Sequence, residues 1–281
     1  MSNNIIFEKS FYGTRAIISG LWDDSYIDLM KRKNVDEIEL NDGKGWNGNS
    51  VEFLEYFPSL KSLIIIDLRI QSVDSIYYLR KLKNLELITY CKDPINFQTF
   101  TELERCDFEW IRNSDSLFEL SKLKSLFINN YKEKNDDSFS NLTNLIELSI
   151  FNSKIEKIDH IFKLKKLKRI RISNLKKIES LEGINQLQEL EELEIQKCKG
   201  ISNVSYIFDL MNLKSLFLID LGNIFSIKGI ENLLNLESLM FYESTNIVDG
   251  DLFPITKLKR LNKISFQNRK HYSHKREDFI L

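Results

Sequence analysis

The chain has 281 residues, 42% hydrophobic and 29% charged, with a formal net charge of −1, which is ample for one cored domain. No stretch approaches the length of a membrane span, and residues 1–20 lack a basic segment followed by a long apolar run, so we expect neither insertion nor secretion. Three scattered cysteines, Cys91, Cys106 and Cys198, cannot pair fully and suit a reducing compartment, which predicts a cytoplasmic protein.

Residues 1–34 are predicted to form an N-terminal cap. Asp24 can cap a short helix whose apolar residues include Ile27 and Met30, and the bases of residues 31–33 oppose the negative end of the helix dipole before Asn34. We expect this helix to cover the first strand of the region that follows, because the end of a repeat array would otherwise expose its core.

A short apolar pattern recurs eleven times in residues 35–266: an apolar residue is followed three and then five positions later by two more. The copies begin at Val35, Leu60, Leu82, Leu103, Leu123, Leu145, Leu167, Leu190, Leu213, Leu236 and Leu261. Steps of 20 to 25 residues exclude helix-pair repeats, which need about 33 residues, and propeller blades, which need about 40. Each copy is too short to bury its own apolar face, so the copies must stack into a solenoid.

Each copy begins as a strand and then changes period. Leu148 and Ile150 point to one face while Ser149 and Phe151 point to the other, as in a β-strand. Apolar residues then come three apart, at Ile155, Ile158, Ile161 and Leu164. This period predicts a 3₁₀ turn or short helix that returns over the back of the sheet.

One copy nearly spells out a known signature. Leu190, Leu193, Ile195, Cys198 and Ile201 follow L-x-x-L-x-L-x-x-N/C-x-L, and on these residues the chain resembles the leucine-rich repeat superfamily, most closely its short bacterial, internalin-like class. The resemblance implies an α/β fold, a right-handed solenoid with a parallel sheet on the concave face and 3₁₀ or short-helix returns on the convex face. It also implies a bacterial protein, although the missing secretion signal separates the chain from secreted internalins.

The chain departs from this signature at the position where the family usually places asparagine. That position holds Leu68, Tyr90, Ile111, Tyr131, Ser153, Leu175, Cys198, Leu221 and Ser244. We therefore expect no regular ladder of asparagine side chains between the turns.

Residues 267–281 form a basic C-terminal tail or cap within the same single domain. The run from residue 259 to 276 has seven bases and no acid: Lys259, Arg260, Lys263, Arg269, Lys270, Lys275 and Arg276. A solvated capping tail is the favoured interpretation, and a nucleic-acid-associated protein that uses this tail is the alternative function. The concave acids would repel a nucleic acid.

Residues able to carry catalysis are sparse. His271 and His274 stand three apart with no cysteine nearby in sequence, so a zinc-dependent hydrolase is a third and weaker hypothesis. The segment from Gly43 to Trp46 lacks the spacing of a phosphate-binding loop. We expect no catalytic residue, no cofactor and no metal.

The outward strand positions of the first four copies are acidic, with seven acids against Arg105 alone. The candidates for protein binding here are Asp67, Glu86, Asp107 and Glu109. Two interpretations stay open: a solvated surface that tolerates mild repulsion, and an electrostatic landing site for a basic protein.

Aromatic and basic residues occupy further outward positions. Trp110, Phe127, Phe151, Arg171, Phe217 and Tyr242 complete the candidate set. Tryptophan, tyrosine and arginine dominate binding energy most often, and burial under a loop or cap is the alternative for the aromatics. The sequence thus predicts a monomeric protein-interaction module that binds a basic protein partner through its concave face and no membrane, with an immunity or inhibitor protein as the candidate role.

Overall fold

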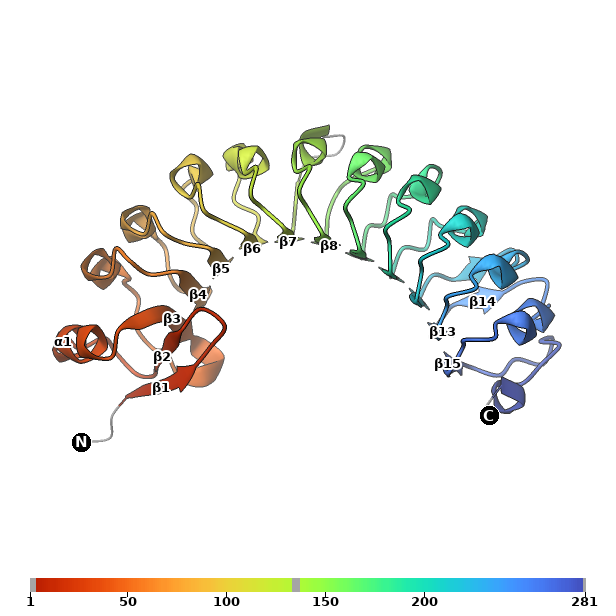
Figure 1. The fold of residues 1–281 in the computed structure, drawn as a ribbon, viewed down its shortest axis with the longest axis horizontal. Coiled ribbons are helices and arrows are strands. Elements are labelled where there is room, and N and C mark those ends of the chain that lie inside the picture. Colours follow the sequence, from red (N-terminus) through yellow and green to blue (C-terminus); the bar gives the residue numbers. More distant parts are fainter. Residues whose placement is uncertain (1–3, 133–136, 280–281) are drawn as a thin grey trace. The chain divides into compact units, whose positions relative to one another are not determined.

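The structure is a computed structural model that describes residues 4–132 and 137–279. The chain divides into two compact units, residues 1–128 (unit 1) and 129–281 (unit 2) (Figure 1). The first three residues of the predicted cap and the last two of the predicted tail lie outside the described residues.

The strands of unit 1 follow one another in chain order across its sheet. They are β1 (Ile5–Lys9), β2 (Thr14–Ile18), β3 (Val35–Asn41), β4 (Ser62–Ile66), β5 (Asn84–Ile88), β6 (Arg105–Glu109) and β7 (Ser125–Asn129), which ends at the unit boundary. β1 is antiparallel to β2, and the pairs from β2 to β6 are parallel. Parallel pairing without stagger places equivalent residues of successive repeats side by side.

Unit 2 continues the same plan. Its main sheet has the order β8 (Glu147–Phe151), β9 (Arg169–Ser173), β10 (Glu192–Gln196), β11 (Ser215–Ile219), β13 (Ser238–Tyr242) and β15 (Lys263–Phe266). A second, two-stranded sheet pairs β12 (Asn223–Ile224) with β14 (Asn246–Ile247) in parallel. The parallel sheet that the repeat pattern predicts is confirmed.

The return segments are 3₁₀ helices, as the three-residue apolar period predicts. In unit 1 they are Glu52–Tyr56, Asp74–Tyr78, Phe97–Thr99 and Asp115–Glu119, and in unit 2 they are Asp137–Asn141, Asp159–Lys163, Ile184–Gln186, Ser205–Asp209, Ile230–Asn232 and Phe253–Lys257. Two further 3₁₀ helices, Asp42–Lys44 and Arg276–Phe279, lie outside this series. Within each unit the helices line the side opposite the strands (Figure 1).

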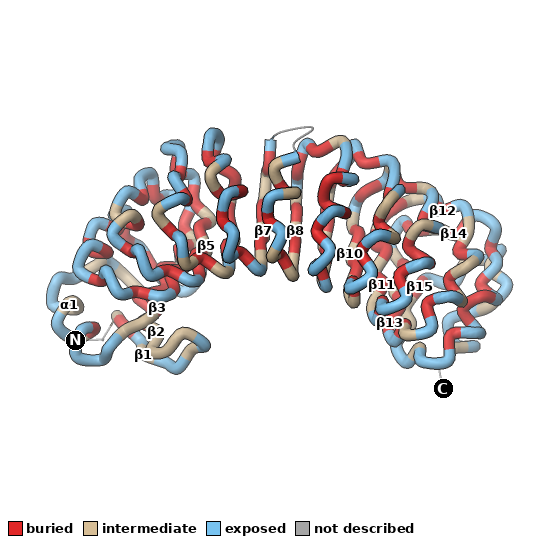
Figure 2. The backbone as a smooth tube through the Cα atoms, turned by 45° about the horizontal axis from the view of Figure 1, so that its top comes forward, coloured by how far each residue is buried: buried red, intermediate tan, exposed pale blue. Residues whose placement is uncertain are grey.

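The core lies between the strands and the return helices. In the copy that begins at Leu190, the side chains of Leu190, Leu193, Ile195, Cys198 and Ile201 are all fully buried. Burial raises the pKa of the Cys198 thiol to about 11, so this cysteine is a core residue without thiolate character at neutral pH. Figure 2 shows buried stretches along the strands and returns of each unit, with exposed residues at the turns.

The N-terminal cap differs from its prediction. The expected helix is present as α1 (Ser25–Arg32), but the Asp24 carboxylate does not cap it; among the described residues Asp24 instead accepts a hydrogen bond from the Trp22 indole at 2.8 Å. Asp24 already has helical dihedral angles, φ −62° and ψ −19°, whereas a capping residue is normally extended. The strand that covers the edge of β3 is β2, reached through an unpredicted β1–β2 hairpin.

The turns after the strands contain a short asparagine ladder, although no regular ladder across the repeats was expected. It lies just before the expected place, at Asn152 and Asn174 one position earlier and at Asn129 two positions earlier. The Asn174 amide donates to Asn152 at 2.7 Å, and the Asn152 amide donates to Asn129 at 2.8 Å. Asn152 and Asn174 have positive φ, 52° and 57°, a conformation that asparagine tolerates better than most residues. Asparagine therefore serves both the left-handed turn and the ladder.

Candidate functional site

The sheet face of unit 1 consists of the strand residues that point away from the core. Strand register places Glu39 beside Ile64, Ile64 beside Glu86, and Glu86 beside Asp107. Phe127 holds the equivalent repeat position on β7, the next strand. The face is therefore a row of carboxylates interrupted and flanked by apolar side chains.

Two acids of this face are neutralised by residues outside the strand pattern. Arg15 on β2 donates to the carboxylate of Glu37 and lies 3.4 Å from that of Glu39, and Lys44 lies 2.7 Å from Glu39. The side chains of Glu37 and Glu39 are only 1% and 4% exposed. The predicted excess of seven acids over one base is therefore too large, because the hairpin and a turn supply the missing bases.

Asp67 and Trp110 do not lie on the accessible surface, and their predicted exposure is wrong. Asp67 is 1% exposed and accepts hydrogen bonds from the Arg69 backbone at 2.8 Å and from its guanidinium at 2.9 and 2.6 Å. These hydrogen bonds lower the pKa of the Asp67 carboxyl. Trp110 is 7% exposed and packs against the rings of Phe108 and Phe118. Asp67 thus shapes a turn and Trp110 fills the core.

The remaining predicted acids, Glu86, Asp107 and Glu109, are partly exposed on the same face. Burial, and then the neighbouring charge of Asp107, raise the pKa of Glu86. Arg105 donates to one Asp107 oxygen at 2.9 Å, while the other, Oδ1, is buried without a hydrogen-bond partner among the described residues. Two carboxylates thus lie side by side, and Arg105 forms an ion pair with one of them, Asp107.

The sheet face of unit 2 balances its charges internally. Arg169 pairs with Glu147 and, at 3.2 Å, with Glu192; Arg171 lies 3.0 Å from Glu192 and 3.6 Å from Glu194. The result is an alternating chain of acids and bases across β8, β9 and β10. Arg171, predicted as a binding residue, is therefore already engaged in ion pairs.

Apolar side chains gather beside this network on β11 and β13. Phe217 is in register with Met240, and Ile219 with Tyr242. Phe217, Met240 and Tyr242 are partly exposed, whereas Ile219 is buried. Phe151, also partly exposed, ends β8. The predicted residues Phe151, Phe217 and Tyr242 are therefore accessible, and two of the three belong to one cluster.

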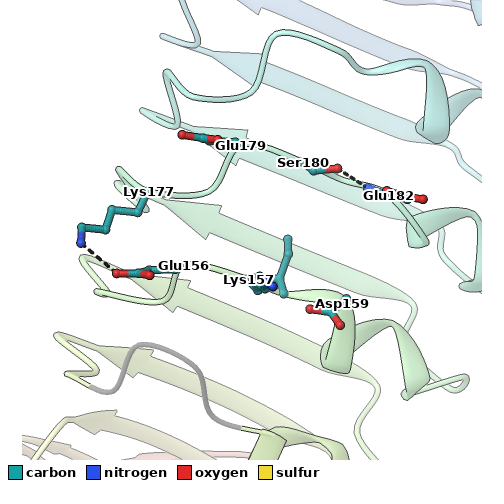
Figure 3. Close-up of a pocket in the computed structure, with 8 residues that line it drawn as sticks. Glu156, Lys157, Asp159, Lys177, Glu179, Ser180 and Glu182 are labelled. Carbon is teal, nitrogen blue, oxygen red and sulfur yellow. Dashed lines mark hydrogen bonds and ion pairs between the residues drawn. The ribbon is translucent and has the colours of Figure 1, made fainter.

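A shallow cleft of about 470 Å³ lies between turns of two successive repeats in unit 2 (Figure 3). Lys177 forms an ion pair of 2.8 Å with Glu156 beside it, and the Ser180 hydroxyl accepts a hydrogen bond from the Glu182 backbone. The described residues contain no group of three or more His, Cys, Asp and Glu side chains that could hold a metal ion. The cleft offers polar contacts without a recognisable catalytic arrangement.

The C-terminal basic segment is folded against the last repeat. Arg269 donates to the backbone carbonyls of Glu243 and Thr245, and the Tyr272 hydroxyl accepts from the Ile247 backbone at 3.0 Å. His271 contacts the Ile247 carbonyl, whereas His274 contacts the Ser273 hydroxyl. The two histidines thus make separate contacts. Arg269, one of the bases on which the nucleic-acid hypothesis depends, instead binds backbone carbonyls of the protein itself.

Comparison with known proteins identifies the architecture. The structure is similar to that of the internalin InlF from Listeria monocytogenes, with a TM-score of 0.68 and 19% identity over 91% of this chain and 87% of that one. The chain has the leucine-rich repeat fold. This leucine-rich repeat chain also resembles the corresponding domain of the type III effector XopL, with a TM-score of 0.50 and 22% identity over 72% of this chain and 73% of that one.

A third similar structure is the Arabidopsis receptor kinase HAESA, solved in complex with the peptide hormone IDA and the co-receptor SERK1. The TM-score is 0.58 and the identity 21%, over 84% of this leucine-rich repeat chain and 46% of that one. No protein-family model matches the sequence, and no curated protein matches it. Within the described part of the chain, no helix is long and apolar enough to cross a membrane.

Proposed function

We propose that this leucine-rich repeat protein binds a basic protein through the sheet face of unit 1. The observation that carries the proposal is the pair Glu86 and Asp107, adjacent and partly exposed carboxylates on neighbouring strands, of which only Asp107 forms an ion pair among the described residues, with Arg105. Like charges placed side by side on a sheet destabilise the fold, so their retention is explained by a partner that brings positive charge.

Apolar side chains beside the carboxylates strengthen the proposal. Ile66 and Ile88 are in register with each other, and Phe127 holds the position equivalent to Asp107 on β7; all three are partly exposed. Binding hot spots often combine a small apolar surface with a neighbouring charge. Packing of the partner against the apolar side chains excludes water, and the ion pairs beside them become stronger. Glu109 extends the acidic edge. The complex of HAESA with a peptide hormone shows that a protein of this fold can bind a polypeptide.

The accessible residues Phe151, Phe217 and Tyr242, together with Arg171, form a second proposed contact area in unit 2. Its charges are internally balanced, so it would contribute apolar contact rather than charge selection. We further propose a cytoplasmic bacterial protein in which residues 1–34 cap repeats 35–266 and residues 267–281 close the other end. Inhibition of a basic toxin or effector, as an immunity protein, is the biological role that fits an acidic capture surface.

Charge reversal tests this function. A tagged double variant, Glu86→Lys with Asp107→Lys, should lose the partner that the wild-type chain captures from lysate, and calorimetry with the purified partner should show affinity at least about 100-fold weaker. Asp28→Lys, an exposed charge change on α1, is the matched control and should bind normally. Circular dichroism verifies that each variant folds. Equal capture by the folded double variant would contradict the proposed function.

A further inference from the structure

The β1–β2 hairpin has a tip, residues 10–13, that its own hydrogen bonds hold in one conformation. The Ser10 backbone donates to the Gly13 carbonyl at 2.8 Å, and the Tyr12 backbone donates to the Ser10 hydroxyl at 3.2 Å. Gly13 has φ +133°, and an added Cβ there would lie 2.0 Å from the Asp36 carboxylate. The tip is therefore preorganised and anchored to β3, rather than a free loop.

This tip reaches over the sheet face of unit 1 (Figure 1). Burial raises the pKa of Tyr12, and the charges of Arg105, Glu104, Glu37 and Asp107 also act on its hydroxyl, although Arg105 and Asp107 lie on β6 and Glu104 directly precedes it, more than 90 positions away in sequence. Ser62 and Asn84 lie between Glu37 and Arg105 in the strand register, and they are 0% and 6% exposed. Tyr12 thus lies against the acidic part of the face.

Phe11, next to Tyr12, faces solvent. It is 94% exposed, more than any other large apolar side chain in residues 4–132 and 137–279, and its ring meets that of Tyr12 edge to face at 5.1 Å. A single exposed apolar residue needs no explanation on a flexible surface, but a rigid tip that presents an aromatic ring beside carboxylates has the form of an anchor for a partner.

The carboxylates near the tip have unused acceptor atoms. Glu86 is partly exposed and makes no ion pair among the described residues, and the partly exposed carboxylate of Asp107 is paired with Arg105 through one oxygen, Oδ2. These oxygens and an aromatic face together suit a planar cation with several N–H donors. Guanidinium fits better than ammonium, because it spreads its donors in a plane and stacks on aromatic rings.

We propose that the hairpin tip and the carboxylates of Glu86 and Asp107 together hold an arginine side chain of the partner, with Phe11 packed against the apolar surface beside that arginine. The inference rests on the proposed function, because it concerns the same face and names the group recognised there. It adds a binding element, Phe11 and Tyr12, that lies outside the repeats. The partner is thus a protein that presents arginine next to apolar side chains.

Calorimetry on the full chain with octa-arginine and octa-lysine peptides at low salt tests the proposal. Wild-type protein should bind octa-arginine more tightly than octa-lysine. Phe11→Ser and Tyr12→Leu should each weaken octa-arginine binding about 3- to 30-fold, the range of a cation–π or aromatic contact. Phe225→Ser, an equally polar change at a side chain 63% exposed in unit 2, is the control and should leave binding unchanged.

The acidic and hairpin variants separate the two proposals. If Glu86→Gln and Asp107→Asn weaken binding while Phe11→Ser and Tyr12→Leu do not, the acidic face stands and the role of the hairpin is wrong. If neither set changes binding, the proposed function fails as well. Equal affinity for octa-lysine and octa-arginine would overturn the choice of arginine. Phe11 is solvent-exposed, so Phe11→Ser remains informative even if Tyr12→Leu perturbs the tip.

Discussion

The two units place charge on equivalent strand positions in opposite ways. In unit 2, Arg169 and Arg171 alternate with Glu147, Glu192 and Glu194, so each base has an acid on the next strand. In unit 1, Glu86 and Asp107 are adjacent acids. The bases that pair with acids on this face are Arg15 of the hairpin, Lys44 of a turn and Arg105 at the start of β6. The same repeat scaffold therefore carries a charge-balanced surface in one unit and a charge-selective surface in the other.

This difference shows how a repeat protein can vary function without changing its fold. Core positions are dictated by packing in every copy, whereas the partly exposed outward positions, such as Glu86 and Phe217, are not fixed by the core. A substitution at a partly exposed outward position thus changes mainly the local charge, whereas one at a buried outward position, such as Asp67, also affects stability. Three predictions probe the comparison between the units.

The largest effect is expected at the buried carboxylate of unit 1. Asp67→Ala should lower the free energy of unfolding by about 2–3 kcal/mol, because it removes charge-assisted hydrogen bonds from a buried group. Since the folded-state pKa of Asp67 lies below its ordinary value of 3.8, the wild type has this stability above that pH and loses it as the pH falls further. Denaturant unfolding from pH 7 to pH 2.5 should therefore show the two proteins converging in acid.

A smaller effect of opposite sign is expected at Glu86. Glu86→Gln should stabilise the fold by about 1 kcal/mol at pH 7, because it removes a charge that lies beside Asp107 and Glu39 and is only partly offset by Arg105 and Arg15. Its folded-state pKa is raised above 4.5, so the wild type loses stability as the pH rises through that value.

The stability gain of Glu86→Gln should therefore be absent at pH 4 and grow toward pH 7, as thermal unfolding would show. A variant that is less stable than the wild type at pH 7 would mean that Glu86 has a stabilising partner, and unit 1 would then resemble unit 2.

The smallest effect is expected in the network of unit 2. Arg171→Gln should cost about 0.5 kcal/mol, since the Arg171 side chain is 44% exposed and exposed ion pairs contribute little. Lys228→Gln, an exposed base in a return segment of the same unit, is the control. A loss above about 2 kcal/mol for Arg171→Gln in chemical denaturation would show that the network of unit 2 acts as a buried ion pair rather than as an exposed, charge-balanced surface.

The repeat fold could be predicted from the sequence because packing imposes it on every copy. Leu190, Leu193 and Ile195 recur at fixed spacing since each must enter the same core, and the three-residue period of the returns follows from 3₁₀ geometry. The β1–β2 hairpin was not predicted, because it occurs once and therefore leaves no repeated pattern in the sequence. Its signal was the β-rich segments at residues 5–9 and 14–18 around the turn residue Gly13.

The candidate site was harder to predict, because outward strand positions do not reveal what covers them. Asp67 and Trp110 occupy outward positions, yet Arg69 and neighbouring rings bury them. Glu37 is buried in an ion pair with Arg15, a residue that precedes the first repeat. By contrast, the partial exposure of Glu86 and Asp107 agrees with their outward positions in the strand pattern.

The antiparallel strand β1 has a consequence for solubility. A parallel sheet built from repeats presents, at its first strand, a hydrogen-bonding edge on which another strand could add. β1 runs against that direction, is only five residues long, and carries Glu8 and Lys9 at its end. Short, charged edge strands discourage edge-to-edge pairing. We therefore expect the charges of Glu8 and Lys9 to disfavour edge-to-edge pairing at the first edge of the sheet.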